Sequence, residues 1–139
     1  MEDVRKLLPK DKFDLSTTEE LMQLDDDEIE AIIPDLLIWI QDMNWPVSQL
    51  IALVLIVHRK LTEKYILDLL KPEQRDNIWK YNIITQLLMK WPSKAYDPRI
   101  IAEIIRIAEE PTKGEMQESV EEAAGEYLDA FVLPEIEGV

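Results

Sequence analysis

The 139-residue chain contains no cysteine and only three glycines. Without cysteine it can form neither a disulfide nor a thiolate metal site, and thiol catalysis is excluded. The glycines stand at 114, 125 and 138, too far apart to form the glycine-rich loop that holds a phosphate group. We therefore expect no cofactor and no nucleotide at this chain.

Histidine is almost absent too, because His58 is the only one. A Ser–His–Asp triad needs a histidine, and so do most zinc sites that lack cysteine. His58 precedes Arg59 and Lys60, and cations of this kind suit the end of a helix. The acids at 25–28 lack the spacing and glycine of a calcium-binding loop and suit a helix start instead. We expect no catalytic residues, no metal site and no enzymatic activity.

Long hydrophobic runs are missing as well. The longest one covers eight residues, 50–57, whereas a membrane-spanning helix needs about 20. The first residues include acids and lead into no apolar stretch, so they do not resemble a secretory signal. We expect a soluble, cytoplasmic protein that does not enter a membrane.

Positive charge is scarce, since 15 basic residues face 29 acidic ones for a net charge of −14. The excess lies at the two ends: residues 1–30 hold eleven acids and four bases, and residues 114–139 hold eight acids and no base. Such a molecule repels nucleic acid and attracts a basic protein at long range. The simpler interpretation, that the acids only keep the protein soluble, is the one we favour.

The apolar residues, 47% of the chain, form a repeat. Doublets of large apolar residues separated by two positions occur at 32–37, 65–70 and 100–105, and a similar pattern lies between them at 50–55, 83–88 and, more weakly, 123–128. Doublets spaced in this way form one wide stripe on a helix. Helix pairs that recur every 33 to 40 residues are typical of a solenoid, in which neighbouring pairs complete one core.

The sequence thus predicts an all-α fold, a short right-handed α-solenoid of about three HEAT-like antiparallel helix pairs with a leading helix. We predict one domain over 1–139, with a leading segment at 1–26, helix pairs at about 27–58, 62–91 and 97–131, and a frayed tail at 132–139. The last helix of the third pair is expected over about 115–131.

Local signals place the helix ends. A Ser-Thr-Thr-Glu run at 16–19 predicts a capping box before the leading helix. Pro34 lies inside the first helix of the first pair and predicts a kink or a later start. Pro46 and Pro98 suit the first position of a helix, and Thr62 is expected to cap the second pair.

Two segments resemble a known family. The sequence LLPKDKFD at 7–14 and the sequence PDLLIWIQDMNWPV at 34–47 are similar to the bacterial family catalogued as domain of unknown function 5071. The part from Trp39 to Val47 is the most specific. The resemblance covers about the whole chain and implies a HEAT-like or armadillo-like right-handed stack. It implies no activity and supplies no catalytic residues.

Five residues are candidates for contact with a partner: Asp42, Asn44, Trp45, Trp79 and Tyr81. The first three lie in a short turn made rigid by the following proline, and tryptophan and tyrosine are frequent at binding hot spots. The alternative for the turn is structural, with the two polar side chains capping backbone groups and the indole fixing the turn to the core. We favour the structural alternative for the turn.

The sequence predicts a non-enzymatic protein-binding module, and these five residues are the first to mutate in a test of binding. An alternative is an acidic immunity-like or antitoxin-like protein that neutralises a basic partner. A HEAT-like DNA-repair glycosylase, which would use tryptophan and aspartate, is disfavoured because the chain lacks a basic groove for phosphates. The polar, acidic ends of the chain predict a monomer rather than a scaffolding dimer.

Overall fold

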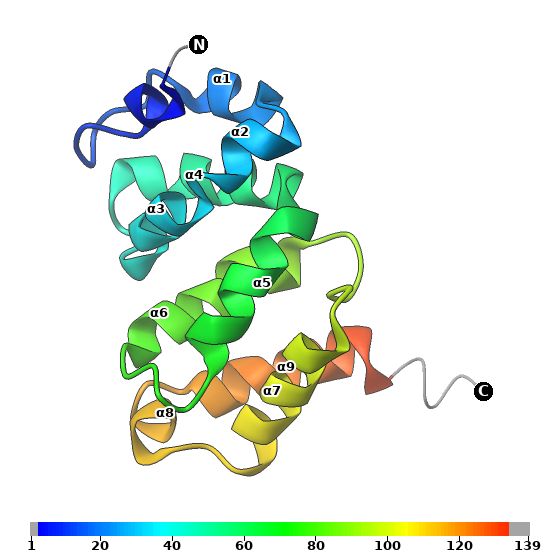
Figure 1. Cartoon of the computed structure of the whole chain (residues 1–139). Helices are drawn as coiled ribbons and strands as arrows, with labels where there is room; N and C mark the ends of the chain where they lie inside the picture. Colours follow the sequence, from blue (N-terminus) through cyan, green and yellow to red (C-terminus); the bar gives the residue numbers. More distant parts are fainter. Residues whose placement is uncertain (1–2, 134–139) are drawn as a thin grey trace. The chain divides into compact units, whose positions relative to one another are not determined.

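The computed structural model describes residues 3–133, and this part of the chain contains helices and turns but no strand (Figure 1). The all-α prediction is therefore confirmed. The chain divides into two compact units, of which the first ends at Thr62 and the second begins at Glu63. Each unit is considered by itself, and the single domain and the three stacked pairs stay predictions.

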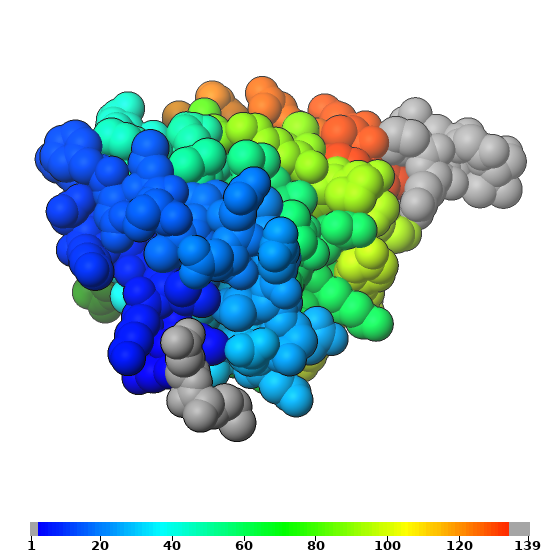
Figure 2. All heavy atoms as spheres, turned by 90° about the horizontal axis from the view of Figure 1, so that it is seen from above, coloured from blue at the N-terminus to red at the C-terminus, as the bar shows by residue number. Residues whose placement is uncertain are grey.

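The first unit is built from short helices around one longer helix. Its elements are the 3₁₀ helix η1 (Val4–Leu7), α1 (Thr18–Gln23), α2 (Asp26–Glu30), α3 (Ile33–Ile38), the 3₁₀ helix η2 (Trp39–Gln41) and α4 (Pro46–Val57). Helix α4 packs against α1, α3 and η2, and Leu21, Leu36, Ile51 and Leu55 between them are fully buried. The segments up to α2, drawn in blue, cover one face of this unit in Figure 2.

Helix ends in the first unit follow only some of the local signals. Helix α4 begins at Pro46, as predicted, and the acids at 25–28 do open α2, where Asp25 accepts a hydrogen bond from the backbone of Glu28. The long helix predicted here is divided, and of the two alternatives at Pro34 the later start is confirmed. Pro34 takes the first turn of α3, where its missing N–H does no harm. The capping box at 16–19 is wrong: the Ser16 hydroxyl donates to the Asp14 carboxylate, and Thr17, which precedes α1, donates to the Leu7 carbonyl and does not cap the helix.

Helix α4 is apolar on almost every side. Its inner face is buried, yet Leu53 is 48% exposed and Val57 is 51% exposed. At its end His58 donates from Nε2 to the carbonyl oxygen of Leu21, 3.0 Å away. His58 therefore joins the end of α4 to the end of α1.

The second unit is built around the helices α5 (Arg59–Leu70), α7 (Pro98–Glu109) and α9 (Val120–Phe131), of 12 residues each. The first turn of α5 belongs to the first unit, and the other elements are α6 (Asn77–Asn82), a π-helical turn η3 (Ile83–Leu87), a 3₁₀ turn η4 (Leu88–Lys90) and α8 (Lys113–Gln117). Helix α9 lies along α7 and also packs against α6 and α8 (Figure 1). Ile84, Ile104 and Tyr127 are among the fully buried side chains of this core.

Two predictions for the second unit are corrected, and a third concerns residues that the structure describes only in part. Thr62 caps no helix, because α5 already begins at Arg59 and the Thr62 hydroxyl donates to the His58 carbonyl one turn earlier. The single helix expected over 115–131 is two helices, since Ser119 adopts a left-handed backbone with φ of 60° between α8 and α9. Of the tail predicted to fray, residues 134–139 lie outside the described residues.

Candidate functional site

Three of the predicted partner-binding residues lie in the turn between η2 and α4. A carboxylate oxygen of Asp42 accepts from the backbone N–H of Asn44 at 2.9 Å, and the Asp42 carbonyl accepts from the buried Ser48 hydroxyl at 2.9 Å. The Trp45 ring packs edge-on against Trp39, with ring centroids 5.6 Å apart. These are the contacts of the structural alternative, and binding by this turn stays a prediction.

The other two predicted residues belong to α6, so the set is divided between the two units. The backbone of Trp79 donates to the carboxylate of Asp76, which caps α6. Tyr81 is 39% exposed, and Ile78, which precedes it by three residues, is 51% exposed. Residues three apart lie on the same side of a helix. The exposed apolar side of α6 is thus formed by Tyr81 together with Ile78, which the sequence reasoning passed over.

A groove lies beside the start of α6. It consists of two adjoining hollows of about 440 and 250 Å³ that share Arg75, Asn77, Gly114 and Gln117 as walls. The larger hollow extends along Pro72, Gln74, Thr112 and Lys113, and the smaller one along Asp76, Ile78 and Glu118. We refer to the two together as the α6–α8 groove. Sequence reasoning missed it, because its two walls come from segments separated by more than 30 positions.

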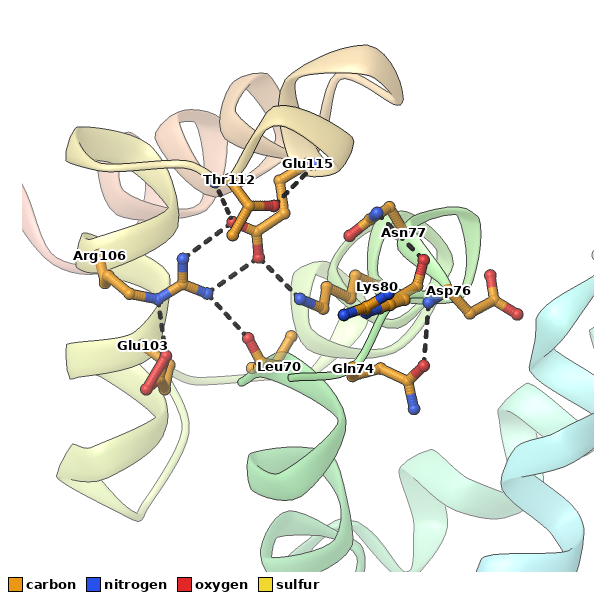
Figure 3. Close-up of polar contacts among 10 residues, drawn as sticks. Leu70, Gln74, Asp76, Asn77, Lys80, Glu103, Arg106, Thr112 and Glu115 are labelled. Atoms are coloured by element: carbon orange, nitrogen blue, oxygen red, sulfur yellow. Dashed lines mark hydrogen bonds and ion pairs between the residues drawn. The ribbon is translucent and has the colours of Figure 1, made fainter. Parts of the chain in front are cut away.

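The walls of the groove meet at Gly114 and Asn77. A side chain at Gly114 would collide with the amide nitrogen of Asn77, so α8 can approach α6 this closely with any other residue only if the Asn77 side chain moves. The same amide nitrogen donates to the Arg75 carbonyl at 3.2 Å. The side chain of Asn77 is therefore held between the two walls, on the side of α6 that faces α8 (Figure 3).

A buried ionic network lies behind the groove, centred on the carboxylate of Glu115 (Figure 3). One carboxylate oxygen accepts from the Thr112 backbone at 2.8 Å and from Arg106 at 2.8 Å. The other accepts from the Lys80 ammonium group at 2.8 Å and from Arg106 at 2.9 Å. The side chains of Lys80 and Glu115 are both fully buried. Thr112 and Glu115 complete a capping box at the start of α8.

The charges of the network balance one another. Arg106 also pairs with Glu103 at 2.9 Å and donates to the carbonyl of Leu70 at the end of α5. Burial alone would raise the pKa of Glu115, but the hydrogen bonds from Arg106, Lys80 and the Thr112 backbone outweigh it and lower the pKa to about 2. The carboxylate of Glu115 raises the pKa of Arg106 in turn. The carboxylate of Glu115 therefore stays ionised between Arg106 and Lys80, and the network joins the ends of α5, α6, α7 and α8.

The model of the family described as Domain of unknown function (DUF5071) matches residues 7–128. The chain belongs to this family. The resemblance seen in the sequence is thereby confirmed, while its HEAT-like aspect stays a prediction. No curated protein matches the chain significantly.

In this member of the DUF5071 family, the matched region contains every residue of the groove and the network. It also contains a second buried carboxylate, that of Glu63, which accepts from the backbones of Tyr96 at 3.0 Å and Asp97 at 2.7 Å. The phenol oxygen of Tyr127 accepts from the backbone of Ala95 at 2.9 Å. These bonds fix the loop before α7, so both carboxylates serve the internal architecture of the second unit.

Two further findings concern the described part of this family member. Between residues 3 and 133, no group of three or more histidine, aspartate or glutamate side chains is arranged to hold a metal ion. No helix in the same range is both long enough and apolar enough to cross a bilayer.

Proposed function

We propose that this DUF5071 domain is a non-enzymatic protein-binding module whose contact surface is the α6–α8 groove with the exposed side of α6. The observation that supports the proposal is the pair Ile78 and Tyr81, large apolar side chains that are 51% and 39% exposed on one side of a helix. Ile78 also lines the groove. Apolar and aromatic side chains beside polar groove walls are the composition typical of a protein–protein contact.

Rigidity of the groove adds support. Its α8 wall is anchored by Glu115, whose carboxylate accepts hydrogen bonds from side chains of α6 and α7. Its α6 wall includes the start of the helix at Asn77, which Asp76 caps. A surface that is already in its binding shape loses little conformational entropy when a partner docks. The buried network thus has a role in the proposal, which is to position the groove without contacting the partner.

The proposal keeps the finer architecture predicted from the sequence, a right-handed stack of three HEAT-like helix pairs in a cytoplasmic monomer. Packing of α3 on α4 in the first unit and of α7 on α9 in the second supports the pairs. The absence of cysteine is typical of a reducing compartment.

A basic partner is the second candidate, in the manner of an immunity-like or antitoxin-like protein. The net charge of −14 favours it, because complementary charge accelerates encounter. This candidate predicts an association rate that falls steeply as salt rises from 50 to 500 mM, with little change in the dissociation rate. An association rate independent of salt would reject it.

Photo-crosslinking in the native cell tests the contact surface. A photoreactive amino acid replaces Ile78 or Tyr81 in the α6–α8 surface, or Leu53 on α4 as a matched exposed apolar position in the first unit. We expect one defined crosslinked protein from positions 78 and 81 and none from 53. A product from position 53 alone would move the contact to α4, and the absence of any product at all three would contradict a protein-binding role.

Pull-down with variants complements the crosslinks. The double variant of Ile78→Ala and Tyr81→Ala is expected to lose the crosslinked partner, whereas the double variant of Asp42→Ala and Trp45→Ala tests the turn predicted from the sequence. Circular dichroism melting of each variant establishes that it is folded. Loss of the partner only in the folded turn variant would favour the first unit as the binding part.

A further inference from the structure

The larger hollow of the α6–α8 groove differs in charge from this acidic chain as a whole and from the smaller hollow, which contains Asp76 and Glu118. The larger hollow has Arg75 and Lys113 in its wall and no acidic residue. Neither of these two side chains forms an ion pair or hydrogen bond with any residue between 3 and 133, although the chain has 29 acids. By contrast, the hollow beside α1 and α2 in the first unit includes Asp3, Glu20 and Glu28. Two bases without counter-charges make the larger hollow suited to an anionic group.

The two hollows place an apolar contact next to these bases. Arg75 lines both hollows, and Ile78, half exposed, lines only the smaller one. A ligand that spans the groove therefore meets two cationic side chains in the larger hollow and the aliphatic side chain of Ile78 in the smaller one, with Arg75 at the junction. The wall of the smaller hollow also contains the acidic residues Asp76 and Glu118. Gln117 also lines both hollows and adds an amide that can bind a peptide backbone.

We propose that the groove binds the C-terminal carboxylate of a partner protein that ends in an aliphatic residue. In such a residue one Cα carries both the carboxylate and the apolar side chain, so the two groups reach the adjoining hollows together. Arg75 and Lys113 bind the carboxylate, and Ile78 contacts the terminal side chain. Because the domain carries a charge of −14, it repels an acidic peptide body, so the last residues of the partner are neutral or basic. This inference rests on the proposed protein-binding function and specifies its ligand.

Peptide binding tests the inference. The probe is a pool of hexapeptides with a neutral dye at the N-terminus, neutral or basic residues in random order, and a final leucine. One pool ends in a free carboxylate and the other in an amide. A third pool is amidated and carries a glutamate side chain at the fourth position. Fluorescence anisotropy measures the dissociation constants for the full chain at low salt.

We expect the free-carboxylate pool to bind about five- to tenfold more tightly than the amidated pool. In the double variant of Arg75→Ala and Lys113→Ala this ratio falls to about one, and in Arg75→Glu it inverts, because the carboxylate is then repelled. Lys60→Ala, at an exposed lysine outside the groove, keeps the ratio. The variants alter exposed side chains, so an unchanged melting temperature is expected and is measured alongside.

Other outcomes separate this inference from the proposed function. Equal binding of the free and amidated pools, lost in Ile78→Ala, overturns carboxylate recognition and leaves a protein-binding groove in place. Preference for the glutamate pool assigns the bases to an internal acidic side chain and likewise overturns the C-terminal assignment. Absence of binding by all pools overturns it too, and the crosslinks at positions 78 and 81 then decide the proposed function independently.

Discussion

Replacing Glu115 by glutamine should lower the free energy of unfolding, because it removes the negative charge at the centre of the buried network. The variant keeps the size of the side chain and an oxygen for the Thr112 backbone, but it leaves Lys80 and Arg106 facing an amide instead of a carboxylate. The folded chain lowers the pKa of Glu115 from 4.5 to about 2. That difference corresponds to about 3 kcal/mol of unfolding free energy at pH 7, in line with the roughly 3–5 kcal/mol lost when a buried ion pair is broken.

The pH dependence of this loss has a definite sign. Because the pKa of Glu115 is lower in the folded than in the unfolded chain, its contribution to stability is complete well above pH 4.5 and disappears as the pH falls towards 2. The difference in unfolding free energy between wild type and Glu115→Gln should therefore be constant from pH 7 to about 5.5 and shrink to about 1 kcal/mol at pH 3.

Urea unfolding is the assay, and it should report the second unit alone. A background chain with Trp39 and Trp45 replaced by phenylalanine retains only Trp79 and Trp91, which both lie in that unit. Tryptophan fluorescence then follows the unit that contains Glu115, and circular dichroism follows the whole chain. Equal m-values for wild type and variant establish that the free energies are comparable.

Glu103→Gln is the matched control. Glu103 bonds to Arg106 at the edge of the network, where its side chain is partly exposed, and its loss should cost less than about 1 kcal/mol. Adding Lys80→Met to Glu115→Gln restores the charge balance and should recover about 1–2 kcal/mol. If Glu115→Gln costs no more than Glu103→Gln at pH 7, or if its cost does not change between pH 5 and 3, the reasoning about buried charge is refuted.

Three smaller perturbations test single contacts by urea unfolding. In the wild-type chain, Gly114→Ala should not raise the free energy of unfolding, because the collision with Asn77 offsets alanine's helix preference. In an Asn77→Ala background, where the collision is gone, the same change should stabilise by about 0.5–1 kcal/mol. Equal effects in both backgrounds would contradict the collision. Tyr127→Phe leaves the backbone N–H of Ala95 without its acceptor and should cost about 1–2 kcal/mol, whereas a neutral result would mean that this N–H finds another partner. Ser48→Ala removes the hydroxyl bonded to two carbonyls before α4 and should cost about 1 kcal/mol. An unchanged urea midpoint would mean that these bonds do not stabilise the fold.

Local signals in the sequence located the helix starts where one residue decides the geometry. Pro46 and Pro98 begin α4 and α7 as predicted, and Asp97 caps α7. In these cases the preference lies within one turn of backbone and does not depend on distant contacts. The apolar doublets were likewise sufficient to show that the chain is helical, because their spacing fits only a helical stripe.

Local sequence signals failed where a side chain forms a hydrogen bond outside the predicted helix start. The capping pattern at 16–19 does not form, because the Ser16 hydroxyl binds the Asp14 carboxylate and the Thr17 hydroxyl binds the Leu7 carbonyl. The pattern at Thr112 and Glu115, equally visible in the sequence, forms a complete capping box. The break at Ser119 had no signal in the apolar pattern, since the doublets at 123–128 continue the stripe of α9 alone. Competing tertiary contacts decided these positions.

The sequence by itself determined the helical class, the family and the acidic character of this domain, because each of these depends on composition, short spacing or a contiguous motif. The tertiary structure alone decided that Lys80, Arg106 and Glu115 share one buried network and that Arg75, Lys113 and Ile78 line one groove. Lys80 and Glu115 are 35 positions apart, and only the packing of α6, α7 and α8 brings their charges within bonding distance. A groove is a property of that packing, since no local pattern records which helices will be neighbours.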